Sequence, residues 1–184
     1  MQIGDLAYES VDRVATITLN RPEKFNAITE RMPGDLAEAV ARANDDDSVH
    51  VIVLTGAGRG FCGGYDLNIF AEGESAAIQD MPWDAMADYQ FMRRCTDSFM
   101  TLWRSPKPVI AKVNGDAVAG GSDIALCCDL IVMNESARIG YPPARVWGCP
   151  TTAMWAYRLG AERAKRMLFT GDLVTGTEAA NMGL

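Results

Sequence analysis

Two short, almost entirely apolar segments constrain the fold most. Residues 49–55 and 109–113 have the length of β-strands, and a near-continuous apolar run is typical of a strand buried on both faces of a sheet. Each follows a segment whose apolar residues recur at helical spacing, residues 29–44 before the first strand and residues 86–103 before the second. Helices that alternate with buried strands predict an α/β domain with a largely parallel sheet.

Shorter elements complete the pattern. Residues 6–11 and 14–20 are rich in β-formers and predict an N-terminal hairpin. We expect Thr29 to be the N-cap of the first long helix and the aspartates at 45–47 to end it. Further predicted elements are a helix at 120–128, short strands at 130–133 and 138–141, and helical structure from 151 to 184 with Gly160 and Gly171 as breaks.

Length and composition fit a single domain over residues 1–184. With 184 residues, of which 48% are hydrophobic and 22% charged, the chain is long enough for one ordinary core. We expect that core to lie roughly within residues 1–150, and a C-terminal helical region to start within 151–184. Segment 72–83, which contains glycine, serine and proline, is the best candidate for a mobile loop.

Charge and hydropathy exclude several partners. A formal net charge of −7 and the lack of a lysine or arginine stripe argue against nucleic acid. No apolar run approaches the ~18 residues that cross a membrane, and the first residues do not resemble a secretion signal. Cysteines without C-x-x-C spacing predict free thiols, no metal and a cytoplasmic protein. They are Cys62, Cys95, Cys127, Cys128 and Cys149.

A glycine-rich loop follows the first buried strand at residues 56–67. A dinucleotide-binding fingerprint would need a third glycine where Phe61 stands, and a phosphate-binding Walker loop would need a Gly-Lys-Ser/Thr sequence that is not there. Gly63 and Gly64 instead offer bare backbone that a ligand is able to approach. We expect an N–H group from this turn to point into a cleft.

A second glycine pair follows the next buried strand, in residues 114–129. Gly120 and Gly121 stand at the start of a predicted amphipathic helix, where backbone N–H groups are free. Asp123 follows Gly120 by three residues and lies in the first helical turn. We therefore expect its carboxylate to reach the cleft that the Gly120 N–H faces.

These two segments resemble the crotonase (enoyl-CoA hydratase/isomerase) superfamily, whose members read roughly G-x-G-x-x-F-[SC]-x-G-x-D-[LI] and N-G-x-[AV]-x-G-G-[GS]-x-[ED]. The resemblance runs over essentially the whole chain. It also covers residues 20–27, 105–111, 128–129 and 161–168. It implies a crotonase-like (ClpP/crotonase) fold of repeated ββα units.

The resemblance implies an oxyanion hole made of the backbone N–H groups of Gly63 and Gly120, which bind the carbonyl oxygen of an acyl-CoA thioester. Asp123 would exchange a proton with the substrate. The resemblance also implies contacts to coenzyme A or to the acyl group from Lys24, Phe25, Ala27, Tyr65, Asp66, Leu67, Val118, Gly121 and Pro143. Asp66 is further expected to cap the short helix that follows it. Coenzyme A arrives as part of the substrate, so no separate cofactor is expected.

One departure from the family concerns the acids. Hydratases of this family use two glutamates, which fall here on Asp123 and Pro143, and proline transfers no proton. Members that shift dienes carry an aspartate at the position of Asp123, but they keep an acid at the position of Pro143. Asp123 alone would suffice for an isomerase, which moves one proton between two carbons. Asp116 is a further acid near the site, expected to be a solvated loop residue.

The second departure is length. Family members continue through helices that complete the pocket and build trimers, whereas the helical pattern here still runs at residues 181–184. Either the chain is truncated or its partner surface differs; a homotrimer or a dimer of trimers is expected if the C-terminal region is present.

The sequence leaves more than one function open. The first hypothesis is an enoyl-CoA hydratase or isomerase of fatty acid metabolism. A second is a crotonase-type acyl-CoA hydrolase or C–C lyase, which also needs an oxyanion hole. The third is a non-catalytic acyl-CoA-binding protein, which Pro143 and the short C-terminus motivate.

Overall fold

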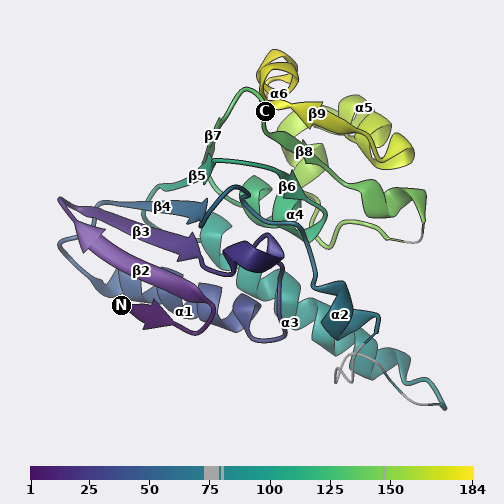
Figure 1. Ribbon diagram of the computed structural model, residues 1–184, viewed down its shortest axis with the longest axis horizontal. Helices are drawn as coiled ribbons and strands as arrows, with labels where there is room; N and C mark the ends of the chain where they lie inside the picture. Colours follow the sequence, from purple (N-terminus) through teal and green to yellow (C-terminus); the bar gives the residue numbers. More distant parts are fainter. Residues whose placement is uncertain (73–78, 80, 147) are drawn as a thin grey trace.

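A six-stranded sheet forms the centre of the computed structural model, which describes residues 1–72, 79, 81–146 and 148–184 (Figure 1). β1 to β3 are antiparallel, and β3, β4, β5 and β7 are parallel, which confirms the predicted hairpin and the largely parallel sheet. The spatial order is β1 (Gln2–Ile3), β2 (Leu6–Val11), β3 (Val14–Leu19), β4 (Val51–Gly56), β5 (Val109–Val113) and β7 (Leu130–Met133).

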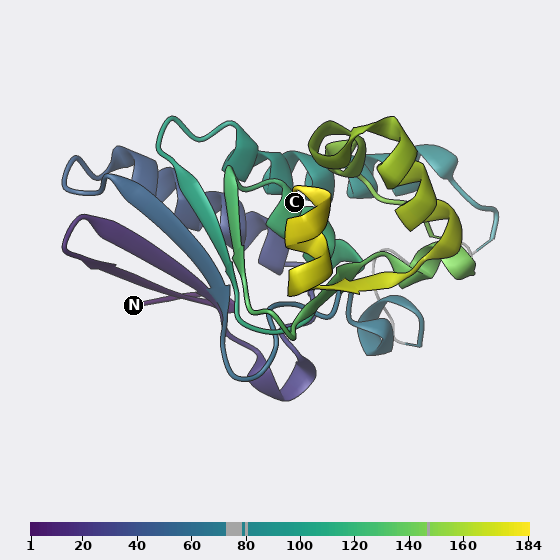
Figure 2. The ribbon, with the colours of Figure 1, turned by 90° about the horizontal axis from the view of Figure 1, so that it is seen from above.

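Two long helices, α1 (Met32–Asp45) and α3 (Ala85–Trp103), pack against each other and lie along one face of this sheet (Figures 1 and 2). Alternate strand residues turn toward them, so Ile52 and Leu54 of β4 are fully buried, whereas Val51 and Val53 on the other face are only half-buried. The apolar run at 49–55 therefore has one deeply buried face, and the expectation of burial on both faces is wrong for this strand.

A smaller sheet of β6 (Ala117–Val118), β8 (Arg138–Gly140) and β9 (Leu173–Thr175) stands beside the first. β8 pairs with β6 in parallel and with β9 in antiparallel orientation. The sequence predicts helical structure throughout 151–184, so β9 corrects it. This strand has only three residues, and its pairing partner lies more than thirty positions earlier in the chain. Local periodicity therefore holds no signal for it.

The other helices are η1 (Pro22–Lys24), α2 (Leu67–Phe70), α4 (Gly120–Leu126), η2 (Pro142–Arg145), α5 (Met154–Thr170) and α6 (Gly176–Met182). α2, α4, α5 and α6 lie where the sequence predicts helical structure, whereas η1 and η2 were not predicted. α1 begins at Met32 with Arg31 at its N-cap, so the expected N-cap, Thr29, lies two residues too early, although its hydroxyl accepts a hydrogen bond from the Met32 amide at 3.2 Å. Gly160 has φ 74° and kinks α5, while Gly171, at φ 64°, ends it.

Most of the loop expected to be mobile, 72–83, lies outside the described residues, which omit 73–78 and 80.

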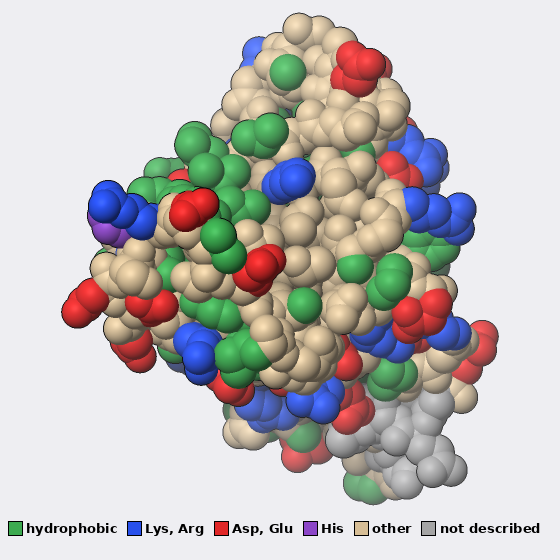
Figure 3. Space-filling view, turned by 60° about the vertical axis from the view of Figure 1, so that its left-hand side comes forward, with side chains coloured by type: hydrophobic (Ala, Val, Ile, Leu, Met, Phe, Trp, Pro, Cys, Tyr) green, Lys and Arg blue, Asp and Glu red, His purple; other side chains and the backbone are tan. Residues whose placement is uncertain are grey.

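The surface and the helices bear on the expected partners. Among the described residues, no helix has the length and apolar character needed to cross a membrane. On the face shown in Figure 3, acidic and basic side chains alternate rather than gather by sign.

Candidate active site

Two glycine loops meet where β4 and β5 end, because neighbouring parallel strands finish at the same edge of a sheet. The Asn114 side chain joins the loops: its Oδ1 accepts from the Gly56 amide at 3.2 Å, and its Nδ2 donates to the Gly58 carbonyl at 3.0 Å. A Cβ on Gly115 would lie 2.0 Å from the carbonyl oxygen of Arg59. The Asn-Gly pair therefore permits the close contact between the two loops.

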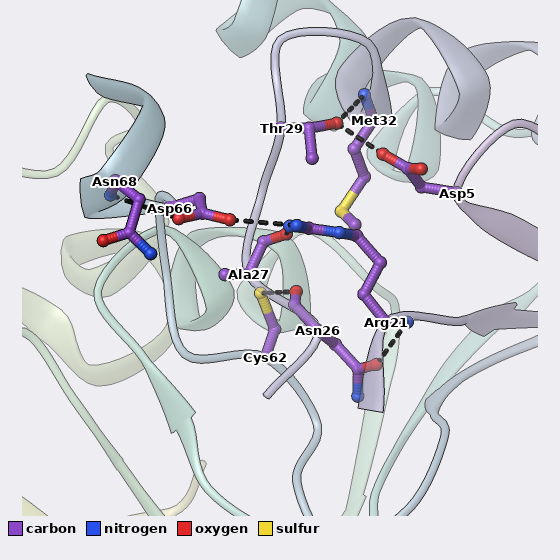
Figure 4. A network of polar contacts seen from close by, with 9 residues as sticks. All are labelled: Asp5, Arg21, Asn26, Ala27, Thr29, Met32, Cys62, Asp66 and Asn68. Carbon is purple, nitrogen blue, oxygen red and sulfur yellow. Dashed lines mark hydrogen bonds and ion pairs between the residues drawn. The ribbon is translucent and has the colours of Figure 1, made fainter. Parts of the chain in front are cut away.

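A buried asparagine attaches a third segment to the first glycine loop (Figure 4). Asn26 is fully buried in the turn after η1. Its Nδ2 donates to the carbonyl oxygens of Ala57, Gly60 and Phe61 at 3.0, 2.9 and 3.1 Å. Its Oδ1 accepts from the Arg21 amide at 2.9 Å. One side chain thus fixes the path of the loop that leads to Gly63 and Tyr65.

Arg21 and Asp66 form a largely buried ion pair beside this turn (Figure 4), with Nη2 and Oδ2 3.0 Å apart. Arg21 Nη1 also donates to the Ala27 carbonyl at 2.7 Å. The other Asp66 oxygen accepts from the Asn68 amide and caps α2, which confirms the predicted cap. Both carboxylate oxygens are therefore used within the fold, and the expected contact of Asp66 with the substrate stays a prediction.

The amide of Gly63 is not available to a ligand. It donates to the carbonyl oxygen of Phe25 at 2.9 Å, within the loop structure that Asn26 organises. An oxyanion hole needs donors that are free to reach the developing charge. The structure therefore contradicts the expectation that Gly63 supplies one of the two free N–H groups.

The amides of Tyr65 and Gly120, by contrast, have no acceptor among the described residues. Ile28 forms a parallel bridge to Tyr65, donating to the Gly64 carbonyl at 2.8 Å and accepting from the Asp66 amide at 3.0 Å. The residue between two such partners turns its own amide to the opposite side. That amide adjoins α4, because a Cβ on Gly64 would lie 3.5 Å from the Gly120 nitrogen.

An unusual backbone conformation at Ala119 sets the direction of the Gly120 amide. Ala119 has φ 54° and ψ −126°, a conformation that alanine rarely adopts and that only a well-fixed surrounding maintains. Its carbonyl accepts from the amides of Ser122 and Asp123 and from the Ser122 hydroxyl, and its amide donates to the Gly140 carbonyl at 3.0 Å. These bonds hold the strained turn while the next amide, that of Gly120, stays free.

Asp123 lies one helical turn beyond Gly120 and is fully buried. Its Oδ2 accepts from the Thr151 amide at 3.5 Å, a long bond, and its Oδ1 has no partner among the described residues. Burial raises its pKa to about 7, against the opposing effect of the Thr151 amide and the neighbouring threonine hydroxyls. A carboxyl group with such a pKa exchanges protons readily near neutral pH.

Comparisons with known proteins show the family to which the chain belongs. The profile of the family named Enoyl-CoA hydratase/isomerase matches residues 9–184. The chain belongs to this family. Its sequence is 35% identical to (E)-benzylidenesuccinyl-CoA hydratase of Thauera aromatica, covering 96% of this chain and 66% of that one. It is 32% identical to 1,2-epoxyphenylacetyl-CoA isomerase of Escherichia coli, covering 93% and 64%.

Solved structures of the family share the fold. The crystal structure of an enoyl-CoA hydratase from Mycobacterium smegmatis matches with a TM-score of 0.90 and 48% sequence identity, covering 99% of this chain and 64% of that one. The chain spans slightly less than two thirds of the length of these three relatives. The predicted crotonase-like fold is thereby confirmed.

The residues that the family resemblance assigns to coenzyme A lie around η1. Lys24 and Phe25 are exposed, and Ala27 is half-buried. Arg59, which the sequence analysis did not select, places its guanidinium 4.3 Å from the centroid of the Phe25 ring. A basic residue within the glycine loop was the available signal. The cluster combines two cations with an exposed aromatic face.

The remaining predicted acyl-site residues have mixed surroundings. Leu67 is exposed at the start of α2, and Val118 and Pro143 are half-buried. A Cβ on Gly121 would lie 2.3 Å from the carbonyl oxygen of Cys62, so the lack of a side chain there lets α4 approach the first loop. Asp116 is paired with Arg138 near the surface, as expected for a loop aspartate.

Proposed function

We propose that this protein is an acyl-CoA enzyme of the enoyl-CoA hydratase/isomerase type, in which the amides of Tyr65 and Gly120 bind the thioester carbonyl oxygen. One observation carries the proposal: these two amides lie on adjoining segments, lack acceptors among the described residues, and flank a buried carboxyl group, Asp123. The oxyanion hole of the sequence hypothesis is kept, with Tyr65 in place of Gly63.

The proposed chemistry depends on the negative charge that develops on the substrate during the reaction. Removing a proton next to a thioester, or adding water to its conjugated double bond, moves negative charge onto the thioester oxygen. Two fixed N–H donors stabilise that charge, and each is worth roughly 3 kcal/mol of activation free energy. The bonds around Ala119 hold one donor in place before the substrate arrives, so little reorganisation is needed during the reaction.

Asp123 is the proposed acid and base. With a pKa of about 7, a large fraction of the Asp123 carboxyl groups is ionised at neutral pH and able to accept a proton. The protonated form then donates this proton in the next step. It lies on the same short helix as the Gly120 amide, which places proton transfer beside the carbonyl that is polarised. Proton transfer between carbons and addition of water both require this arrangement.

The coenzyme A end of the substrate is proposed to lie at η1. Lys24 and Arg59 would meet phosphate groups, and the exposed ring of Phe25 offers a surface to the adenine. Ala27, Leu67, Val118, Gly121 and Pro143 are retained as proposed neighbours of the pantetheine and acyl parts. No separate cofactor or metal enters the proposal.

The proposal extends to the location and assembly of the protein. All five cysteines are free, in agreement with a reducing compartment, and we propose the cytoplasm. A homotrimer or a dimer of trimers remains a proposal that rests on the family resemblance. Light scattering coupled to size exclusion tests it directly.

The experiment compares 2-enoyl-, 3-enoyl- and 3-ketoacyl-CoA as substrates for the wild-type protein and for Asp123→Asn. Hydration or double-bond migration by the wild type, lost in Asp123→Asn, is expected. Release of free coenzyme A would favour the hydrolase. Tight binding of acyl-CoA without turnover of any substrate would contradict the enzymatic proposal and favour the non-catalytic binder that Pro143 motivates.

A further inference from the structure

Three buried polar atoms at the site have no hydrogen-bond partner among the described residues. They are the Tyr65 hydroxyl, Asp123 Oδ1 and the Thr151 hydroxyl. Thr151 adjoins Asp123, since its amide reaches the other carboxylate oxygen at 3.5 Å. Tyr65 lies close to the start of the helix that carries Asp123, because a Cβ on Gly120, three residues before Asp123, would be 3.1 Å from its ring. Burial, the neighbouring Cys95 thiol and then ionised Asp123 raise the pKa of its phenol, in agreement with a hydroxyl close to that carboxyl group.

Packing fixes the position of the Tyr65 hydroxyl. A Cβ on Gly120 would lie 3.1 Å from Cε2 of Tyr65, so the ring rests directly on the start of α4. On another side the ring meets Phe70 edge-on, with centroids 5.3 Å apart. The residue whose amide is proposed to bind the thioester oxygen thus also places a fixed hydroxyl group within the site.

Buried polar groups without partners are costly, and nearly all such groups in folded proteins are satisfied by protein, water or ligand. A plain hydrocarbon acyl chain offers no donor or acceptor to Tyr65 or Asp123. A water molecule offers both, and it needs two or more polar partners at such a site. Pro143, which takes the position of the family's second acid, has no polar side-chain atom to contribute.

We propose that the Tyr65 hydroxyl and Asp123 together hold the water molecule that adds to a 2-enoyl-CoA, so that Tyr65 positions the water in place of a second carboxylate. This inference rests on the proposed function and narrows it to hydration.

One carboxylate, that of Asp123, is enough to transfer both protons involved in the addition of water. The water oxygen forms a bond to the β-carbon while ionised Asp123 accepts one proton from that water. The electron pair of the double bond moves toward the α-carbon and the thioester oxygen, where the amides of Tyr65 and Gly120 bind the charge. Protonated Asp123 then gives its proton to the α-carbon and returns to its starting state. The Tyr65 hydroxyl keeps its proton throughout and orients the water by a hydrogen bond.

The test compares Tyr65→Phe with a matched control, Tyr141→Phe. Tyr65→Phe keeps the ring and the backbone amide and removes only the hydroxyl. Tyr141 also has a buried hydroxyl close to Asp123, but that group already donates to the Cys149 carbonyl at 2.8 Å. Two rates are measured for each protein: hydration of crotonyl-CoA, and exchange of the α-protons of butyryl-CoA with deuterium oxide. Exchange needs the amides and Asp123 but consumes no water.

Tyr65→Phe is expected to hydrate at least tenfold more slowly in kcat, with exchange lowered threefold at most and a melting temperature no lower than that of the wild type. Tyr141→Phe is expected to change both rates by less than threefold. Equal hydration by Tyr65→Phe and wild type, an equal fall of both rates, or a clearly lower melting temperature would each overturn the inference.

The wild-type protein separates the two proposals. If the wild type exchanged the α-protons of butyryl-CoA but did not hydrate crotonyl-CoA, the role of Tyr65 would be overturned, whereas the proposed acyl-CoA chemistry would stand. A wild-type protein that neither hydrates crotonyl-CoA nor exchanges butyryl-CoA protons would contradict the proposed function, and this inference with it.

Discussion

The ring of Tyr65 lies directly on Gly120, so that a Cβ at position 120 would stand 3.1 Å from Cε2 of Tyr65 and 2.8 Å from Cδ1 of Ile28. Both contacts are with side-chain atoms, which are able to move by a few tenths of an ångström. A methyl group at position 120 is therefore compatible with the fold. It would, however, shift the Gly120 amide relative to the amide of Tyr65.

Gly120→Ala is accordingly expected to fold, with a loss of about 1–2 kcal/mol in the free energy of unfolding, and to lose at least ~10-fold in kcat/KM. Gly34→Ala in α1 is the control, since a Cβ there meets nothing within 4 Å. It should gain about 0.5–1 kcal/mol without a change in activity. Denaturant unfolding and steady-state kinetics check both, and full activity of Gly120→Ala would contradict the assignment.

The two glycines before Tyr65 provide a second contrast. A Cβ on Gly63 would be in ordinary contact with Phe25 at 3.5 Å, whereas Gly64 has φ 96° and its Cβ would lie 2.8 Å from that of Ala119. Gly63→Ala should keep kcat/KM within ~3-fold, and Gly64→Ala should lower it by ~10-fold or more. The same assay measures both; a greater loss in Gly63→Ala would favour the original assignment of the oxyanion donor to Gly63.

Replacing Asp123 by asparagine removes the proposed proton carrier and should lower kcat about 10²–10⁴-fold. In the wild type, kcat/KM should fall as the pH drops below about 7, because protonation removes the base. A pH series on both proteins checks this, and the acidic limb should be missing from the residual activity of the variant. If the pH profile of Asp123→Asn kept an acidic limb at the same pH as the wild type, that limb would belong to another group.

The raised pKa of Asp123 also predicts how stability depends on pH. Between the ordinary value of 3.8 and about 7, the folded protein holds a proton that the unfolded chain has released. For this group the free energy of unfolding therefore falls by about 1.4 kcal/mol per pH unit across that window. Asp123→Asn should stabilise the protein by about 4 kcal/mol at pH 8, and by only about 1 at pH 4.5. Urea unfolding at the two pH values measures this difference, and an equal effect at both would show that Asp123 is not proton-linked.

The Arg21–Asp66 ion pair should be structural, because its side chains are 18% and 7% exposed and Asp66 also caps α2. Asp66→Asn is expected to cost about 1–3 kcal/mol of unfolding free energy. The exposed pair of Arg93 and Asp97 is the control, and Asp97→Asn should cause no measurable loss. Equal stability of the two variants would contradict the structural role of Asp66.

The helices and strands of the core could be predicted from sequence because their signals are local. Apolar periodicity located α1, α3, β4 and β5 to within a few residues. β9 was missed because three residues carry no period, and only pairing with β8 makes them a strand. The parallel core could therefore be predicted, whereas of the small sheet beside it only β8 was predicted, as the strand at 138–141.

The same distinction, between local signals and contacts that form only in the folded chain, applies to the site. Asp123 and Gly120 could be chosen by residue type and spacing, because a carboxylate three residues after a helix start lies on the same helical face. Gly63 could not be ruled out, since its amide is occupied by the carbonyl of Phe25, from a turn that closes only in the folded chain. No side chain marks a free backbone amide, so the role proposed for the Tyr65 amide had no signal in the sequence.

A crystal structure with an acyl-CoA thioester bound tests the central claim most directly. The account predicts the thioester carbonyl oxygen within about 2.7–3.2 Å of the backbone nitrogens of both Tyr65 and Gly120, with Asp123 beside the α- and β-carbons. A thioester oxygen bound elsewhere, with these two amides still lacking a partner, would contradict it.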